Sequence, residues 1–152
     1  YYPNLDAALM SSNGKYIAPQ QIETILGGDV FIEQVAVIGN NRNYVTAIIA
    51  PNIEAIKGYA EQNGIKYEYV DELMDNPQVC KMMEERIANL QKDMAPYEKI
   101  KKFRMIKRGF TIESGELTST LKLRRAVILQ NYAAMIEEMY NPVQGPLGGY
   151  AK

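Results

Sequence analysis

The sequence predicts an α+β fold, in which helices back a small three-stranded, mainly antiparallel sheet and a short hairpin or turn lies near the N-terminus. Two observations predict this class. The runs 31–38 and 44–49 are almost continuously apolar, and the Gly/Asn-rich turn 39–43 joins them as in an antiparallel hairpin. The segments on either side repeat apolar residues at helical spacing instead, so the expected order is α-β-β-α-α-β-α.

Turn-forming residues bound the first elements of the chain. Ser11–Gly14 is a turn cluster, and the short extended stretch 15–17 follows it. Pro19 suits the first position of a helix over 19–26, which a pair of glycines then ends. Because the two hairpin strands are apolar at nearly every position, we expect helices to cover that pair on at least one face.

The later elements follow from the same patterns. Helices are expected where apolar residues recur every three or four positions, namely over 53–62, 69–74 (one or two turns), 78–94 and 124–139. Pro77 opens the third of these helices, and Pro96 follows its end. The stretch 99–106 alternates in part, which predicts a third strand. Its lysines suit an edge strand that is protected from aggregation.

Composition limits the possible chemistry. The chain has 152 residues, a net charge of -1, no histidine and one cysteine. The small net charge gives no overall attraction to nucleic acid or membrane, and the lack of histidine removes the commonest general base and metal ligand. We therefore expect no metal site, no internal disulfide and a cytoplasmic location. Any chemistry must use lysine, arginine, carboxylates, hydroxyls or the backbone.

The domain organisation is expected to be simple, with one domain over 11–140. Residues 1–10 are interpreted as the remnant of a hinge or of an added segment, and the Pro/Gly-rich stretch 141–152 as a disordered tail. No apolar run approaches the roughly 20 residues that a membrane-spanning helix needs. Residues 1–10 also lack the basic and apolar regions of a signal peptide.

The segment 111–125, TIESGELTSTLKLRR, is the first candidate for function. Ser114 and Gly115 form a turn signal, and the hydroxyl-rich run before Lys122 does not suit a helix interior. A lysine on such a loop can be delivered to a phosphate or a carboxylate. From these residues alone, a solvated basic helix start is the default interpretation. Basic residues at a helix N-terminus oppose the helix dipole, which hints at another role.

Two weaker patterns each have a structural alternative. The basic residues between 99 and 108 could attract a polyanion, but a solvated strand edge is the preferred interpretation, because only Phe103 is present for base stacking. The basic residues of this run are Lys99, Lys101, Lys102, Arg104, Lys107 and Arg108. The turn Ser12-Asn13-Gly14-Lys15 could bind an anion through its backbone, although an ordinary hairpin turn is the default.

Two separated motifs resemble the C-terminal domain of AMP-forming acyl-CoA synthetases, in the adenylate-forming superfamily. They are NGKYIAPQQIE at 13–23 and GELTSTLKLRR at 115–125. The intervening IEQVAVIGNNRNYVTAIIAPN is also similar, and the likeness runs from about residue 9 to residue 140. The long-chain fatty-acid branch is the most similar, with Ser119 in place of its usual proline and Arg124 in place of a lysine.

The resemblance implies a two-step ligase whose small C-terminal domain moves between two poses on a large N-terminal domain. A fatty acid and ATP first form an acyl-adenylate and pyrophosphate, and the thiol of coenzyme A then displaces AMP. By position, Lys122 is the lysine that reaches the carboxylate and the α-phosphate. The residues implied to position its loop are Gly115, Glu116, Thr118 and Thr120. Those implied to line the coenzyme A entrance are Asn13, Gly14, Lys15 and Tyr16.

The resemblance also implies what this chain needs from elsewhere. ATP, Mg²⁺ and coenzyme A are expected in the full-length enzyme and none on this chain alone, because the family's phosphate-binding motif is not in the sequence. The implied partners are the N-terminal domain and a fatty acid, with no nucleic acid, and the chain alone is expected to be inactive. A ligase for another carboxylic acid and a non-catalytic module that binds polyanions through 99–108 stay open, as does peripheral membrane association of the full-length enzyme.

Overall fold

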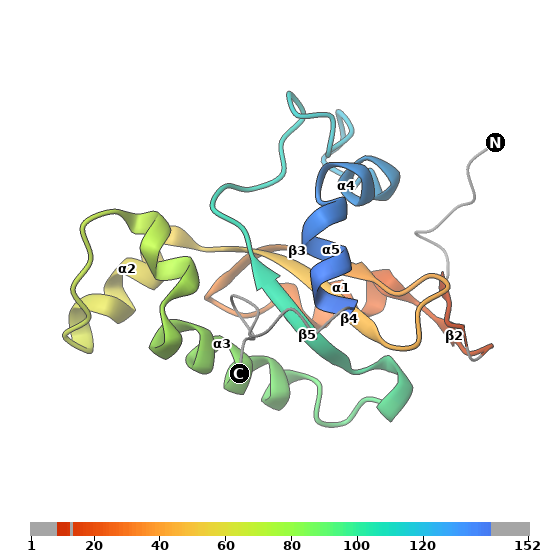
Figure 1. The fold of residues 1–152 in the computed structure, drawn as a ribbon, viewed down its shortest axis with the longest axis horizontal. Coiled ribbons are helices and arrows are strands. Elements are labelled where there is room, and N and C mark those ends of the chain that lie inside the picture. The colour runs from red at the N-terminus through yellow and green to blue at the C-terminus, as the bar shows by residue number, and fades with distance from the viewer. Residues whose placement is uncertain (1–8, 13, 141–152) are drawn as a thin grey trace.

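The computed structural model describes residues 9–12 and 14–140, and it confirms the α+β class (Figure 1). Its elements in chain order are β1 (Leu9–Met10), β2 (Tyr16–Ile17), α1 (Pro19–Gly27), β3 (Ile32–Ile38), β4 (Val45–Pro51), α2 (Ile53–Gln62), η1 (Val70–Asp75), α3 (Pro77–Leu90), η2 (Pro96–Glu98), β5 (Ile100–Met105), α4 (Arg125–Asn131) and α5 (Ala133–Tyr140). In this part of the chain, no helix is long and apolar enough to cross a membrane. The predicted tail 141–152 and most of the predicted segment 1–10 lie outside the described residues.

The main sheet has the order β3-β4-β5, with β4 in the centre. β3 and β4 pair antiparallel, with Val35 opposite Ile49, as the hairpin pattern predicted. β4 and β5 pair parallel, with Ile48 opposite Arg104, so the sheet is mixed and the prediction of a mainly antiparallel sheet was wrong. The reason lies in the connection, because α2, η1 and α3 intervene before β5 and such a helical crossover joins parallel strands.

Alternate side chains of the sheet fill two cores, one on each face. Val35 and Val37 pack on one face with residues of α1, α2 and α3, which we call the first core. Ala36 and Ile38 pack on the other face with residues of α4 and α5, the second core, and Figure 1 shows α5 crossing this face. All 7 residues of β4 are buried, which explains its continuous apolar run. The β3–β4 hairpin is therefore covered on both faces.

The predicted N-terminal hairpin is formed by β1 and β2, with Met10 opposite Tyr16. Ser11 closes its turn, because the Ser11 N–H donates to the Lys15 C=O at 2.9 Å and Ser11 Oγ accepts from the Lys15 N–H at 3.1 Å. Gly14 has φ +80°, a conformation that glycine adopts without strain. Two backbone hydrogen bonds also attach this hairpin to the turn between β3 and β4.

Helix α3 begins where the sequence predicted but ends earlier. The Asn76 side chain caps it by accepting hydrogen bonds from two N–H groups of the first turn. The helix ends at Leu90 rather than at Met94. The buried side chain of Gln91 instead bonds both backbone groups of Ile100, at 2.8 and 3.1 Å, and so fixes the start of β5.

The helix predicted over 124–139 is two helices, α4 and α5, separated at Tyr132. Tyr132 has φ -114° and ψ 24°, outside the helical range, and its ring packs edge-on against Phe110 with 6.2 Å between centroids. The apolar spacing continues across the break, since Ile136 and Met139 lie in the second core. No proline or glycine marks the break, so the local pattern could not predict it.

Candidate functional site

The loop that carries Lys122 is closed into a small turn near the top of Figure 1. Leu117 and Leu123 form an antiparallel bridge at its base. The Thr118 N–H donates to the Lys122 C=O at 2.8 Å, and the Lys122 N–H donates to Thr118 Oγ1 at 3.1 Å. The Leu121 N–H donates to the Thr118 C=O at 2.8 Å. These bonds fix the backbone of Lys122 at the tip of the turn.

The Lys122 side chain is exposed, and within the described ranges its ammonium group makes no hydrogen bond or ion pair. Thr118 and Thr120, which were predicted to position the loop, lie beside it with their hydroxyl oxygens 3.0 Å apart. The backbone of Lys122 is therefore held while its charge faces outward. This is the geometry that a cation needs if it is to act on groups bound by a neighbouring domain.

Leu121, which precedes Lys122, has an unusual backbone conformation. Its φ is +66°, which costs an L-residue with a Cβ atom roughly 1–2 kcal/mol. The other described residues with positive φ are three glycines and Asn41, which tolerate this region better. Leu121 is 67% exposed, so burial within this domain does not offset the cost. A leucine gives no sequence signal for such a conformation.

A buried carboxylate, that of Glu116, anchors the base of the loop. Glu116 is 1% exposed and accepts hydrogen bonds from Ser114 Oγ at 2.8 Å and from Asn131 Nδ2 on α4 at 3.0 Å. Gly115 turns the chain between Ser114 and Glu116 with φ +81°. Burial, and then the charge of Glu116, raises the pKa of the nearby Tyr132 hydroxyl. Gly115 and Glu116 thus lie at the base of the loop that carries Lys122, and their role in positioning it stays a prediction.

An ion pair joins the ends of the two motifs, 13–23 and 115–125. Arg125 donates to the Glu23 carboxylate from Nη1 at 2.5 Å and from Nη2 at 3.1 Å, and Arg125 is 4% exposed. Arg125 Nη1 also donates to the Val37 C=O at 2.8 Å, and Glu23 accepts from the Val37 N–H at 2.8 Å. The pair therefore ties α1, β3 and α4 together. The pair was not predicted from the sequence, although the opposite charges at the two motif ends were an available signal.

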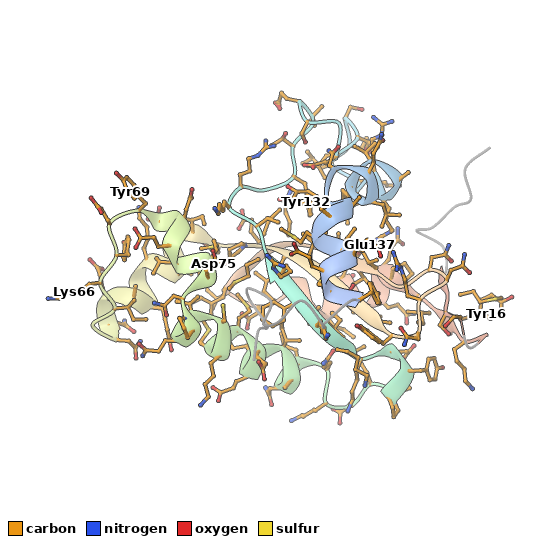
Figure 2. All side chains as sticks on the ribbon, in the orientation of Figure 1. Tyr16, Lys66, Tyr69, Asp75, Tyr132 and Glu137 are labelled. Carbon is orange, nitrogen blue, oxygen red and sulfur yellow. The ribbon has the colours of Figure 1, made fainter. Side chains whose placement is uncertain are left out.

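Three of the residues predicted to line the coenzyme A entrance, Gly14, Lys15 and Tyr16, lie together at the β1–β2 turn and are exposed. Asn13, the fourth, lies outside the described residues. Lys15 Nζ is 5.5 Å from the centroid of the Tyr97 ring. Figures 1 and 2 show this hairpin at the right-hand end of the view, apart from the Lys122 loop at the top. The domain itself therefore does not bring the two predicted regions together.

Two of the basic residues between 99 and 108, Lys102 and Arg104, take part in the domain's own contacts. Arg104 Nη1 donates to Glu138 Oε1 on α5 at 2.8 Å, and Lys102 Nζ lies 5.8 Å from the centroid of a tyrosine ring. Phe103 is buried in the first core, so it presents no face on which a base could stack. These contacts favour the structural interpretation of a charged strand edge.

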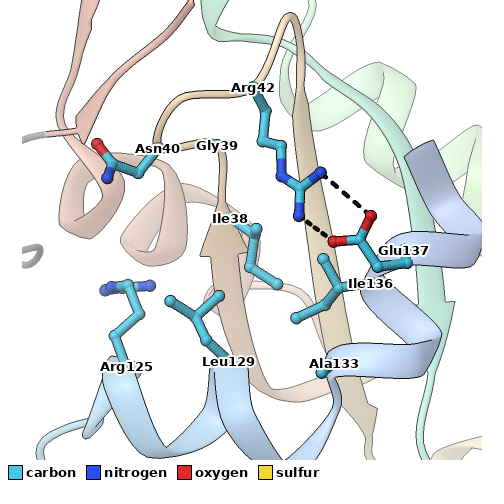
Figure 3. A pocket seen from close by; sticks show the side chains of 9 residues that line it. All are labelled: Ile38, Gly39, Asn40, Arg42, Arg125, Leu129, Ala133, Ile136 and Glu137. Atoms are coloured by element: carbon cyan, nitrogen blue, oxygen red, sulfur yellow. Dashed lines mark hydrogen bonds and ion pairs between the residues drawn. The ribbon is translucent and has the colours of Figure 1, made fainter.

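A cavity of about 210 Å³ lies between the end of β3 and helices α4 and α5 (Figure 3). Ile38, Leu129 and Ile136 form its apolar wall, and Arg42 and Glu137 pair at its rim. The hydrogen bond from Arg42 lowers the pKa of the Glu137 carboxyl. The cavity does not include the Lys122 loop. Over the described ranges, no group of three or more His, Cys, Asp or Glu side chains is placed to hold a metal ion.

Comparison with known proteins gives consistent matches. The family described as AMP-binding enzyme C-terminal domain matches residues 6–144. The long-chain-fatty-acid–CoA ligase FadD15 of Mycobacterium tuberculosis is 29% identical over 134 residues, 88% of this chain and 22% of that protein. The peroxisomal long chain acyl-CoA synthetase 7 of Arabidopsis thaliana is 30% identical over 145 residues, 90% of this chain and 21% of that protein.

A solved structure gives the same assignment for the fold. The adenylation domain of a carboxylate reductase from Mycobacterium chelonae superposes with a TM-score of 0.72 at 25% identity, over 93% of this chain and 20% of that one. The chain spans about a fifth of the length of the curated relatives it matches. The family match includes both sequence motifs and most of the chain, and it confirms the resemblance on which they were singled out. The chain belongs to the family of AMP-binding enzyme C-terminal domains.

Proposed function

We propose that this chain is the C-terminal domain of an ATP-dependent, AMP-forming long-chain fatty acid–CoA ligase, and that Lys122 acts in the adenylation step. The observation that carries the proposal is the outward ammonium group of Lys122, which has no partner among the described residues and sits on a closed turn. The names of the two relatives support the ligase class. Because this chain spans about a fifth of them, the acyl, ATP and Mg²⁺ sites belong in this proposal to the N-terminal domain of the same polypeptide.

In the first step, a carboxylate oxygen of the fatty acid attacks the α-phosphorus of ATP, and pyrophosphate leaves. Both reactants are anions, so Lys122 between the carboxylate and the α-phosphate offsets their repulsion and stabilises the charge of the transition state. Lys122 acts as a fixed positive charge and exchanges no proton. When the domains close, the loss of water strengthens this interaction. Bound Mg²⁺ would supply further neutralisation of the phosphates.

In the second step, the thiol of coenzyme A attacks the acyl carbon, AMP leaves, and the thiol proton is lost to solvent or a base. This step does not bring two anions together at a phosphorus atom, so it does not need Lys122. A rotation of the domain then replaces the Lys122 loop by the β1–β2 turn at the entrance for coenzyme A. The charge of Lys15 and the open backbone at Gly14 suit the phosphates of that substrate.

The acyl class rests on the long-chain relatives, because the acyl pocket lies outside this chain. A ligase for another carboxylic acid would use the same C-terminal chemistry, since Lys122 meets only the carboxylate end. The assay must therefore include acids of several lengths and classes. The cytoplasmic location of the enzyme stays a prediction.

Two lysine variants of the full-length enzyme test the proposal. Lys122→Ala is expected to lower the rate of acid-dependent AMP formation by about 10²–10³-fold, the usual effect of removing one stabilising group from a transition state. Lys101→Ala, which removes an exposed lysine of β5, is the matched control and should keep the wild-type rate. AMP is measured with ATP, Mg²⁺, coenzyme A and the panel of acids. An unchanged rate in Lys122→Ala would refute the role of the lysine, and highest activity on an acid that is not a long-chain fatty acid would refute the substrate class.

A further inference from the structure

The tip of the Lys122 loop carries an exposed leucine in a conformation that leucine disfavours. Leu121 has φ +66°, and the residue is 67% exposed. Each of the other described residues with positive φ is a glycine or an asparagine, the residue types that enter this region most readily. Leu121 belongs to neither core of the domain. Packing within the domain therefore does not compensate for the backbone conformation.

The other two leucines of this loop, Leu117 and Leu123, pack against the domain, whereas Leu121 does not. Leu117 is buried and Leu123 is partly buried, and both contact the second core. Leu121 lies between them in the sequence but projects from the turn into solvent. Its left-handed backbone lets the N–H and C=O of Lys122 both meet Thr118, as in short hairpin loops that close with a residue of positive φ. Glycine would close such a turn at lower cost.

We propose that Leu121 is an apolar contact residue that seats the Lys122 loop on the N-terminal domain of the same polypeptide during adenylation. Disfavoured backbone conformations persist where their surroundings compensate for them, and they gather at functional sites. Within this domain the hydrogen bonds of the turn hold the Leu121 backbone, but the mostly exposed side chain lies in neither core, so we place its packing partner outside the domain. Leu121 and Lys122 are adjacent, so the surface that receives the lysine also covers the leucine. This inference rests on the proposed function.

The partner of Leu121 is an apolar patch at the rim of the substrate site rather than the acyl chain. The lysine stem is longer than the leucine side chain. When the ammonium group reaches the reacting carboxylate, the shorter side chain of Leu121 therefore lies further out, at the level of the loop backbone. The contribution of Leu121 should consequently be the same for acids of different chain length.

Two substitutions in the full-length enzyme separate the contact from the backbone effect. Leu121→Asn removes the apolar side chain but keeps a residue that tolerates the left-handed region, and Leu121→Gly removes both the side chain and the strain. Val30→Ala is the matched control, because Val30 is an aliphatic residue, 59% exposed, in the turn before β3. Adenylation is measured as acid-dependent ATP–pyrophosphate exchange. Thioester formation is measured separately, from preformed acyl-adenylate and coenzyme A.

Both Leu121 variants are expected to lower the adenylation rate by about tenfold or more, the effect of losing one buried aliphatic contact. Thioester formation and the Val30→Ala enzyme should keep wild-type rates, and Leu121→Gly should not lower the thermal unfolding midpoint. Unchanged adenylation, an equal loss in both half-reactions, or a loss that grows with acyl chain length would overturn the inference. Lys122→Ala in the same assay separates the two proposals. If Lys122→Ala abolishes adenylation and the Leu121 variants do not, only the inference fails, whereas intact adenylation in Lys122→Ala removes the proposed role of Lys122, on which the inference rests.

Discussion

Lys122 and Arg125 are basic residues three positions apart, and their surroundings are opposite. Lys122 is exposed at the loop tip, whereas Arg125 is buried and bonded to Glu23. The chemistry of each side chain suits its place, because the planar guanidinium forms two parallel bonds to a carboxylate and the ammonium is a compact charge on a flexible stem. In the sequence both residues belong to one basic helix start. Only the family resemblance singled out Lys122.

Of the other residues of the candidate site, the family motif predicted which ones belong to the loop but not their burial or backbone conformation. Gly115 and Glu116 could be placed in the loop from the motif, but the burial of Glu116 could not be predicted, because glutamate is normally exposed unless distant partners hold it. Those partners include Asn131 on α4. The positive φ of Leu121 could not be predicted from the sequence either, since leucine has no preference for positive φ. The burial of Glu116 depends on a contact with α4 made after the chain folds, whereas the Leu121 conformation comes with the turn that Thr118 and Lys122 close.

Tyr140 gives a pH prediction at the scale of a single residue. Burial raises its pKa from 10.0 to about 12, and its hydroxyl donates to the Tyr44 C=O at 2.8 Å. The folded state therefore disfavours the tyrosinate, so the stability due to neutral Tyr140 is fully present below a pH of about 10 and is lost as pH rises toward about 12. We expect the midpoint of denaturant unfolding to fall across this window. Tyr140→Phe should show a smaller fall, and an identical profile in that variant would contradict the assignment.

Among the elements, the features best predicted from the sequence are those that residues close in the chain determine, such as helix starts and the hairpin turn. Pro19 and Pro77 mark the starts of α1 and α3, and the Gly/Asn turn marks the β3–β4 hairpin. The direction of β5 was missed because it depends on the path of the whole crossover. The end of α3 was missed because the Gln91 side chain bonds the backbone of Ile100, across 9 positions of the chain. The break at Tyr132 has no local signal either.

The Glu23–Arg125 ion pair gives a prediction at the scale of elements, because it joins α1 to α4. Glu23→Gln replaces the carboxylate that both Arg125 Nη atoms bond with a neutral amide, and breaking a buried pair from one side costs roughly 3–5 kcal/mol. We expect a loss of this order in the free energy of unfolding of the chain, measured in denaturant. Glu54→Gln is the control, because it breaks the exposed pair with Lys57 and should change stability far less. Equally small losses in both variants would show that the pair does not hold the elements together.

At the scale of the whole molecule, the sheet lies between two cores, one on each face. The helices that anchor the Lys122 loop pack in the second core, and the β1–β2 hairpin lies elsewhere on the same domain (Figure 1). In the proposed cycle, a rotation of one rigid body would therefore present first the lysine and then the hairpin to the N-terminal domain. In that proposed cycle, the two half-reactions would depend on different parts of one surface.

The most direct test is the ratio of the two half-reaction rates in the full-length Lys122→Ala enzyme. Adenylation, followed in a single turnover by release of pyrophosphate, is expected to fall by about 10²–10³-fold. Thioester formation from preformed acyl-adenylate and coenzyme A is expected to stay close to the wild-type rate, because the proposed rotation takes Lys122 out of the site before this step. Losses of equal size in the two half-reactions would contradict the proposed role of Lys122.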